Sequence, residues 1–224
     1  MQANTTAQQQ EKNFQYTLSK FSHELRNPLA LINSELQLMV SSHPEIAAYD
    51  GWDNILDSLE YVKELLNELS DYNNSGKLTL HPTDLYPFLC TVLASFKPTL
   101  EYLGIVLETD IPSHLPTLPL DPVKMRLALL NLLRNAQESI SHPRGKIRVQ
   151  AQVLSDGICI TIQDNGCGIT SSQLKDIFTP FATFKPCGTG LGLPITQQII
   201  EAHGGHLEIS SAPGQGTEVR IFLG

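Results

Sequence analysis

Phe21-Ser22-His23-Glu24-Leu25-Arg26-Asn27-Pro28-Leu29 sets the fold of the N-terminal part of this chain. Around this stretch, apolar residues recur at steps of three and four, the spacing that two packed helices require. They are Phe14, Leu18, Phe21, Leu25, Leu29, Ile32, Leu36 and Met39. At about 100° per residue, His23 lies roughly opposite the first four of these. The pattern predicts a helix that presents His23 to solvent, where a lone histidine is usually only a surface residue.

A second helix is predicted after the break at Ser41-Ser42-His43-Pro44. Its apolar face consists of Ile55, Leu59, Val62, Leu66 and Leu69. Because two such helices bury little surface by themselves, we expect two copies of the hairpin to dimerise into a four-helix bundle. Asn73-Asn74-Ser75-Gly76 then breaks the helix. We therefore expect a helical hairpin over 1–75 and a separate domain over 76–224.

Composition narrows the class of protein. The chain has 224 residues and a formal charge of −8, which disfavours nucleic-acid binding because phosphate neutralisation needs a basic surface. No apolar run approaches the roughly 20 residues that span a bilayer. Its four cysteines lack metal-ligand spacing and are typical of reduced thiols. A cytoplasmic location is expected, and the cytoplasmic part of a membrane receptor would have the same features.

From residue 77 onward, helical and alternating patterns are mixed. The predicted strands lie at 78–80, 105–107, 147–153, 158–162, 207–209 and 219–221, and the predicted helices at 84–93, 121–140 and 193–202. The prolines between 112 and 119 predict a loop. These elements predict an α/β sandwich of antiparallel strands with helices on one face. Together with the hairpin, the fold class is α+β.

Asn131 and Asn135 stand four residues apart on the helix expected over 121–140, so their amides point the same way. A polar pair in a leucine-rich helix is costly unless it meets a partner or ligand. Amide oxygens are suitable ligands for Mg²⁺. A surface stripe, or a buried hydrogen-bonded pair, would explain the two residues equally well.

Two glycine-rich stretches follow. Asp164-Asn165-Gly166-Cys167-Gly168-Ile169 comes directly after a buried strand, where a carboxylate can accept from an exocyclic amine and glycines admit a flat base. Gly188-Thr189-Gly190-Leu191-Gly192-Leu193 precedes a helix, whose first amides favour phosphate. Between them, 178–186 predicts an aromatic-flanked lid with Lys185 within reach of phosphates. Each stretch by itself is also typical of an ordinary tight turn.

In this order and spacing, the motifs closely resemble the catalytic core of a two-component sensor histidine kinase. FSHELRNPL is similar to the family's H box, NLLRNAQES to its N box, and DNGCGI and GTGLGL to its two glycine boxes. FTPF resembles the F box, and PGQGTEV the closing hairpin. The short lid resembles the nitrogen-regulation and sporulation-kinase branch. The match spans nearly the whole chain from about Phe14.

The resemblance implies a dimerisation and phosphotransfer hairpin followed by an ATP-binding domain of the Bergerat type, shared with gyrase and heat-shock ATPase chaperones. It implies that His23 is phosphorylated by ATP and that Glu24 acts as general base or orienting carboxylate. Asn135 would ligate Mg²⁺, and Asn131 would support the phosphates. The expected cofactors are therefore ATP and Mg²⁺.

The same resemblance assigns the nucleotide pocket and the partners. Asp164 would hold the adenine amine, and Gly166 and Gly168 would shape the base pocket. The residues implied for phosphates and lid are Lys185, Gly188, Thr189, Gly190, Leu191 and Gly192. The expected partners are a second copy of the chain and a response-regulator receiver domain, with membrane contact only through a sensor region outside this sequence. Asn27, one turn after His23, permits phosphatase activity towards that regulator, or merely satisfies the helix backbone.

Two other functions compete with the kinase. Gyrase, chaperone and mismatch-repair relatives hydrolyse ATP with a glutamate four residues before the Mg²⁺ asparagine, and this chain has Asn131 there. A non-catalytic scaffold is the other alternative, and it typically loses one of the ATP-site residues that are intact here. The sequence therefore favours the kinase.

Overall fold

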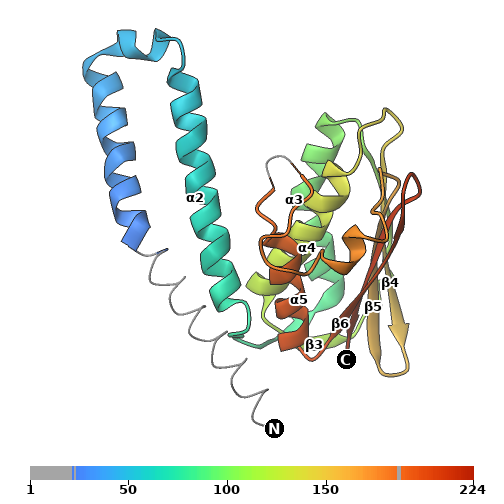
Figure 1. Cartoon of the computed structure of the whole chain (residues 1–224). Helices are drawn as coiled ribbons and strands as arrows, with labels where there is room; N and C mark the ends of the chain where they lie inside the picture. The colour runs from blue at the N-terminus through green and yellow to red at the C-terminus, as the bar shows by residue number, and fades with distance from the viewer. Residues whose placement is uncertain (1–21, 23, 186–187) are drawn as a thin grey trace. The chain divides into compact units, whose positions relative to one another are not determined.

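The chain folds into two compact units, which meet in sequence between Asn74 and Ser75 (Figure 1). The structure, a computed structural model, describes Ser22, residues 24–185 and residues 188–224. The first unit is helical, and the second combines helices with strands. The α+β fold class predicted from the sequence is confirmed. None of the described helices is both long and apolar enough to cross a membrane.

The first unit is a helical hairpin. One helix covers residues 24–42, a short 3-10 helix η1 (Pro44–Ala48) follows, and α2 (Trp52–Asn74) returns (Figure 1). The Nη2 atom of Arg26 lies 3.4 Å from the carbonyl oxygen of Leu66 and 3.4 Å from Oδ1 of Asn67, so the guanidinium links the two helices. The apolar residues expected at 14, 18 and 21, and His23 itself, lie outside the described residues.

The second unit is built on a five-stranded sheet with strand order β2-β4-β5-β7-β6. Its strands are β2 (Val106–Asp110), β4 (Lys146–Leu154), β5 (Gly157–Asp164), β6 (His206–Ala212) and β7 (Gly216–Leu223). A separate antiparallel pair is made by β1 (His81–Asp84) and β3 (Thr117–Leu120). The helices are α3 (Leu85–Tyr102), α4 (Pro122–Glu138), η2 (Gln173–Lys175) and α5 (Gly192–Ala202).

The core lies between the sheet and the helices α3, α4 and α5, which cover one face of it (Figure 1). The strands contribute inward residues at every second position, as the alternation predicted. These are Ile147, Val149, Ala151, Ile158, Ile160, Ile162, Val219, Ile221 and Leu223, all buried. Register pairs Ala151 with Ile160 and Ile160 with Ile221, so the inward residues form continuous rows across the sheet.

Three strand predictions need correction. Residues 78–80 are not a strand, because the amide of Thr79 donates to the Asp121 side chain and not to a neighbouring strand. The proline-rich loop includes β3, in which Pro119 lies opposite Pro82. Because prolines lack an N–H, they are uncommon in strands, and a proline-containing edge strand is therefore hard to predict from sequence. The sheet is mixed, since β2 runs parallel to β4, with α4 in the connection between them.

Asp121 joins three segments at the N-terminal end of α4. Its Oδ1 accepts from the amides of Val123 and Lys124 at 3.1 Å, and its Oδ2 accepts from the amide of Thr79 at 2.8 Å. Its own amide donates to Nε2 of His203 at 2.9 Å. Burial is the largest influence and raises the pKa of Asp121, but the three amide donors and the charge of Lys124 together outweigh it and hold the pKa below its usual value.

We expect Asp121→Ala to lower the free energy of unfolding of the second unit by about 1–2 kcal/mol at neutral pH, because a helix cap and a link to Thr79 are lost together. A carboxylate with a depressed pKa stabilises the fold above its unfolded pKa and loses that effect as pH falls through the folded pKa. The difference from wild type should therefore shrink below about pH 4.

Urea unfolding of the full chain, followed by circular dichroism, measures this loss. Fluorescence of the sole tryptophan, Trp52, reports the hairpin separately and should not change. Asp84→Ala is the matched control, because Asp84 caps α3 with one exposed bond to the amide of Tyr86 at 3.2 Å. An equal loss in both variants would contradict the role of Asp121 as a junction.

Candidate functional site

The C-terminal half of α4 carries the two asparagines singled out in the sequence. Nδ2 of Asn131 lies 3.4 Å from the carbonyl oxygen of Gly192, the first residue of α5. Asn135 lies one turn further along α4 and is half-buried. The amide of Asn131 therefore lies beside the N-terminal end of α5, where exposed amide groups favour an anion. Nothing in this arrangement requires Gly192 to lack a side chain, since a Cβ there would lie 3.9 Å from Asn131.

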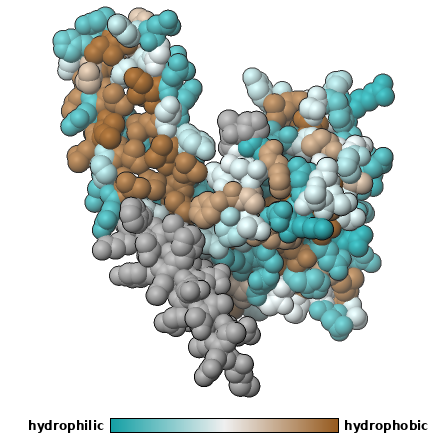
Figure 2. Space-filling model, in the orientation of Figure 1, coloured by the Kyte–Doolittle hydropathy of each residue, from teal (hydrophilic) through white to brown (hydrophobic). Residues whose placement is uncertain are grey.

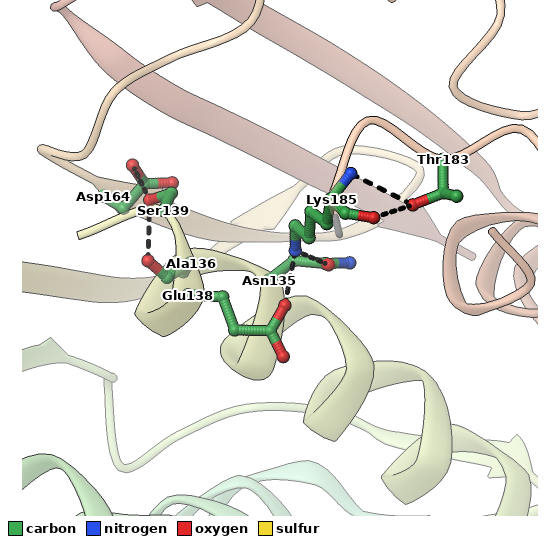
Figure 3. Close-up of polar contacts among 7 residues, drawn as sticks. All are labelled: Asn135, Ala136, Glu138, Ser139, Asp164, Thr183 and Lys185. Carbon is green, nitrogen blue, oxygen red and sulfur yellow. Dashed lines mark hydrogen bonds and ion pairs between the residues drawn. The ribbon is translucent and has the colours of Figure 1, made fainter. Parts of the chain in front are cut away.

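Lys185 of the lid contacts Asn135 directly (Figure 3). Its Nζ donates to Oδ1 of Asn135 at 2.8 Å and to Oε2 of Glu138 at 2.5 Å. The lid backbone is fixed locally, because the amide of Lys185 donates to Oγ1 of Thr183 at 3.2 Å. Both partners of the ion pair are about 40% exposed (42% for Lys185 and 39% for Glu138), so the pair itself contributes little stability.

The oxygen atoms that surround the Lys185 ammonium are suitable ligands for a hard cation that also binds phosphate. Asn135 and Glu138 present an amide oxygen and a carboxylate oxygen to one ammonium group. Mg²⁺ usually takes one or two such oxygens and completes its shell with water and phosphate. No group of three or more histidine, cysteine, aspartate or glutamate side chains that could hold a metal occurs within the described part of the chain.

Asp164 lies at the end of β5 and is only 7% exposed. Its Oδ1 accepts from Oγ of Ser139 at 2.9 Å (Figure 3). The same oxygen accepts from the amide of Gly166 at 2.8 Å. Burial, the largest influence, raises the pKa of this carboxyl above its usual value. The donors Gly166, Ser139 and Thr217 and the charge of Lys185 lower the pKa but do not cancel the effect of burial.

The glycines after Asp164 are required by packing. A Cβ on Gly166 would overlap Oγ of Ser139 and lie 2.6 Å from its carbonyl oxygen. Gly168 has a φ of +68°, and a Cβ there would overlap the carbonyl oxygen of Ala212 on β6. These contacts hold the loop against α4 on one side and the β6–β7 hairpin on the other. The shape of this loop is thus set by close backbone contacts.

The second glycine-rich stretch is tied to the lid. Gly190 has a φ of +71°, and its carbonyl oxygen accepts from the amide of Phe181 at 3.1 Å. Phe181 also has a positive φ, of 66°, although it is not a glycine. Oγ1 of Thr189 accepts from the amide of Leu191 at 3.2 Å, and Leu191 is fully buried at the start of α5. The amide of Gly188 donates to the carbonyl oxygen of Lys185 at 3.3 Å.

The structure gathers the predicted nucleotide residues in the second unit. Asn135 contacts the lid at Lys185, and Ser139, one turn later, contacts Asp164. Sequence reasoning did not single out Ser139 or Glu138, although both lie in the NLLRNAQES stretch, where their spacing of three and four from Asn135 places them on the same helix face. The sequence also did not single out Thr217, whose backbone amide donates a hydrogen bond to Asp164 and lowers its pKa.

The residues predicted for phosphotransfer belong to the first unit. Glu24 and Asn27 are exposed on the helix over residues 24–42. His23 lies outside the described residues. The two groups of predicted site residues therefore fall in separate units of the chain.

Known proteins with similar sequences are ATPases and histidine kinases. Residues 120–224 match the family described as histidine kinase-, DNA gyrase B- and HSP90-like ATPase. The signal transduction histidine-protein kinase AtoS of Escherichia coli K12 is 31% identical over 203 residues, which is 90% of this chain and 33% of AtoS. These matches support the catalytic core of a sensor histidine kinase.

Other relatives of this kinase core are similar over the same extent. Sporulation kinase B of Bacillus subtilis is 29% identical over 211 residues, which is 90% of this chain and 47% of that kinase. The chain thus spans between a third and a half of the length of these curated relatives. Among solved structures, full-length ShkA in complex with AMPPNP has a TM-score of 0.77 at 25% identity, over 92% of this chain and 44% of ShkA. Histidine kinase AdeS of Acinetobacter baumannii has a TM-score of 0.63 at 26% identity, over 90% of this chain and 96% of that one.

Proposed function

We propose that this kinase core binds ATP with Mg²⁺ in the second unit, phosphorylates His23, and passes the phosphoryl group to an aspartate of a response regulator. One observation carries the nucleotide part of this proposal. Asn135 lies in the last turn of α4 and contacts the lid lysine, and Ser139 directly follows that helix and contacts the buried Asp164. The proposed cation position and the contact to the base-recognising carboxylate are therefore held by the same end of one rigid helix.

Each end of the nucleotide has a suitable partner. Asp164 accepts a hydrogen bond from the exocyclic amine of adenine, since its carboxylate is buried and already oriented. Asn135 and Glu138 would hold Mg²⁺, and Asn131 and the N-terminal end of α5 would support the phosphates. Lys185 donates to Oδ1 of Asn135 in this structure, so its ammonium would have to leave that oxygen to Mg²⁺ and would then be available to pair with phosphate.

The chemistry proposed for His23 is in-line phosphoryl transfer. Its Nε2 attacks the γ-phosphorus of ATP while the bond from that phosphorus to the bridging oxygen of ADP breaks. Glu24 accepts the proton from the imidazole or holds the ring in the required orientation. When bound, Mg²⁺ offsets negative charge on the phosphates. The protein's contribution is thus mainly positioning and charge neutralisation.

ATP hydrolysis is the main competing activity within the matched ATPase family. It needs a base that activates water, and the resemblance places a glutamate at position 131 in the hydrolytic relatives. Here Asn131 has an amide that donates to the carbonyl oxygen of Gly192. An amide cannot accept a proton from water at neutral pH. The residue types thus support transfer to His23 over transfer to water.

The hairpin supports the proposal that the active form is a homodimer. In α2, Trp52, Leu59 and Leu66 are buried at seven-residue spacing, whereas Ile55 and Val62 are 50% and 36% exposed. On the other helix, a second seven-residue series is also exposed. It consists of Leu25, Ile32 and Met39, which are 45–48% exposed.

Figure 2 shows an apolar surface along the hairpin, and both of its helices carry exposed apolar side chains: Leu25, Ile32, Met39, Ile55 and Val62. Soluble single chains rarely expose an apolar surface that extends over two helices. The seven-residue repeat is the spacing of helices that pack in a bundle. We therefore assign this surface to a second copy of the hairpin, which would complete a four-helix bundle.

Asn27 supports a further proposed activity, the removal of phosphate from the regulator. Its side chain is exposed one turn after position 23, where a docked receiver domain could contact it. An amide there can orient a water molecule for attack on an aspartyl phosphate, without itself acting as a base.

The kinase activity is tested with γ-labelled ATP and Mg²⁺. Wild type should acquire acid-labile label, and His23→Gln should lose that label while its affinity for ATP changes by less than about twofold. Asn135→Ala should lower the labelling rate by about 100-fold, because charge neutralisation at the phosphates is lost. Release of phosphate without labelled protein would identify an ATPase. The absence of both labelled protein and released phosphate would indicate a non-catalytic scaffold.

The dimer is tested with Ile32→Asp, which would place a carboxylate in the apolar seam. We expect the dimer dissociation constant to rise by about 100-fold, because an unpaired charge would be desolvated. Analytical ultracentrifugation measures the change. Val123→Asp is the control, since Val123 is 77% exposed in the second unit. An unchanged dimer in Ile32→Asp, or no dimer in wild type, would refute the bundle.

The phosphatase role is tested by following the decay of a labelled response regulator. Asn27→Ala should slow dephosphorylation by about tenfold, since the water would no longer be oriented. Asn54→Ala replaces an exposed asparagine on α2 and should leave the rate unchanged. Equal rates for Asn27→Ala and wild type would remove Asn27 from this role.

A further inference from the structure

We propose that Ser139 positions the Asp164 carboxylate for the exocyclic amine of adenine, and that its hydroxyl thereby contributes to the choice of base. Ser139 is a positioning residue in this proposal, because it acts through Asp164. The inference rests on the proposed function, since it concerns how the same pocket recognises ATP.

The contact joins the helical layer to the sheet. Ser139 directly follows the last residue of α4, and its Oγ lies 2.9 Å from Oδ1 of Asp164 at the end of β5 (Figure 3). The amide of Gly166 donates to the same oxygen at 2.8 Å. Two donors on one oxygen restrict rotation of the carboxylate about its last bond. The direction in which the carboxylate can accept from a ligand is therefore defined before the ligand arrives.

The position of Ser139 is itself fixed by its backbone. Its amide donates to the carbonyl oxygen of Asn135 at 3.1 Å, and its carbonyl oxygen accepts from the amide of Cys167 at 2.9 Å. A Cβ on Gly166 would overlap Oγ of Ser139, so the loop is in close contact with the hydroxyl. The hydroxyl is thus held between helix and loop, and small movements of either would change its distance to Asp164.

The hydroxyl has one hydrogen and two neighbours that can accept it. Oγ of Ser139 lies 2.7 Å from the carbonyl oxygen of Ala136 and 2.9 Å from Oδ1 of Asp164. When Asp164 is ionised, the hydroxyl can donate to it. When Asp164 is protonated, the carboxyl can donate to Oγ, and the hydroxyl can donate to Ala136. Ser139 can therefore adapt to both protonation states, but it stabilises the charged one.

This preference matters because Asp164 is buried. Burial raises the pKa of Asp164, whereas the amides of Gly166 and Thr217, the Ser139 hydroxyl and the charge of Lys185 oppose that rise. Without the hydroxyl, the pKa would rise further. The carboxylate would then lose its acceptor capacity at a higher pH than in wild type.

The test compares two nucleotides in the full chain. ADP carries the exocyclic amine, and the diphosphate of purine riboside lacks it. We expect Ser139→Ala to raise the dissociation constant for ADP by about fivefold to tenfold, and to change that for the amine-free nucleotide by less than about twofold. Isothermal titration calorimetry measures both constants. Ser155→Ala, at an exposed serine in the β4–β5 turn, is the matched control and should change neither.

Ser139→Cys is a second variant that keeps a weak donor in a slightly larger side chain, and it should show an intermediate loss of preference for ADP. The acid-side loss of ADP affinity should also begin at higher pH in Ser139→Ala than in wild type. Equal weakening of both nucleotides would show a packing role only and overturn the inference, as would unchanged ADP binding. Failure of wild type to bind ADP would overturn the proposed function itself.

Discussion

Burial of one face of α4 against the sheet is the constraint on which the rest of the second unit depends. Met125, Leu129 and Leu133 are at most 2% exposed, so the helix cannot rotate or slide without opening cavities in a close-packed core. Its first turn is held by Asp121, Asn135 lies in its last turn, and Ser139 directly follows it. A fixed helix therefore keeps the proposed cation-binding Asn135 at a constant separation from Ser139, which contacts the base-recognising Asp164.

The two ends of the proposed nucleotide site differ in physical character. Asp164 is buried and held by donors from α4 and from its own loop, so its contacts are strong and directional. The contact of Lys185 with Glu138 is exposed, so it contributes little stability. The proposed base end is therefore preorganised in this arrangement, whereas the proposed phosphate end depends on an exposed contact.

The two units also reach stability by different routes. The second unit closes its own core, in which strand residues such as Ile147 and Ile160 are fully buried. The hairpin leaves Ile32 and Ile55 about half exposed, so much of its apolar surface stays in contact with water in one chain. The stability of the hairpin is therefore expected to depend on protein concentration. The stability of the second unit is expected not to depend on it.

Sequence alone determined what depends on local spacing and residue type: α4 from Asp121-Pro122, the alternating strands β4 and β5, and the glycine-rich stretches. The sequence did not predict β3, because its prolines are not typical of a strand, and it did not predict that β2 runs parallel to β4. Only the tertiary structure decided which groups meet. Asp121 contacts Thr79 and His203 from 42 and 82 residues away, and Ser139 meets Asp164 across 25 residues. Such contacts follow from how layers pack, and local periodicity carries no information about them.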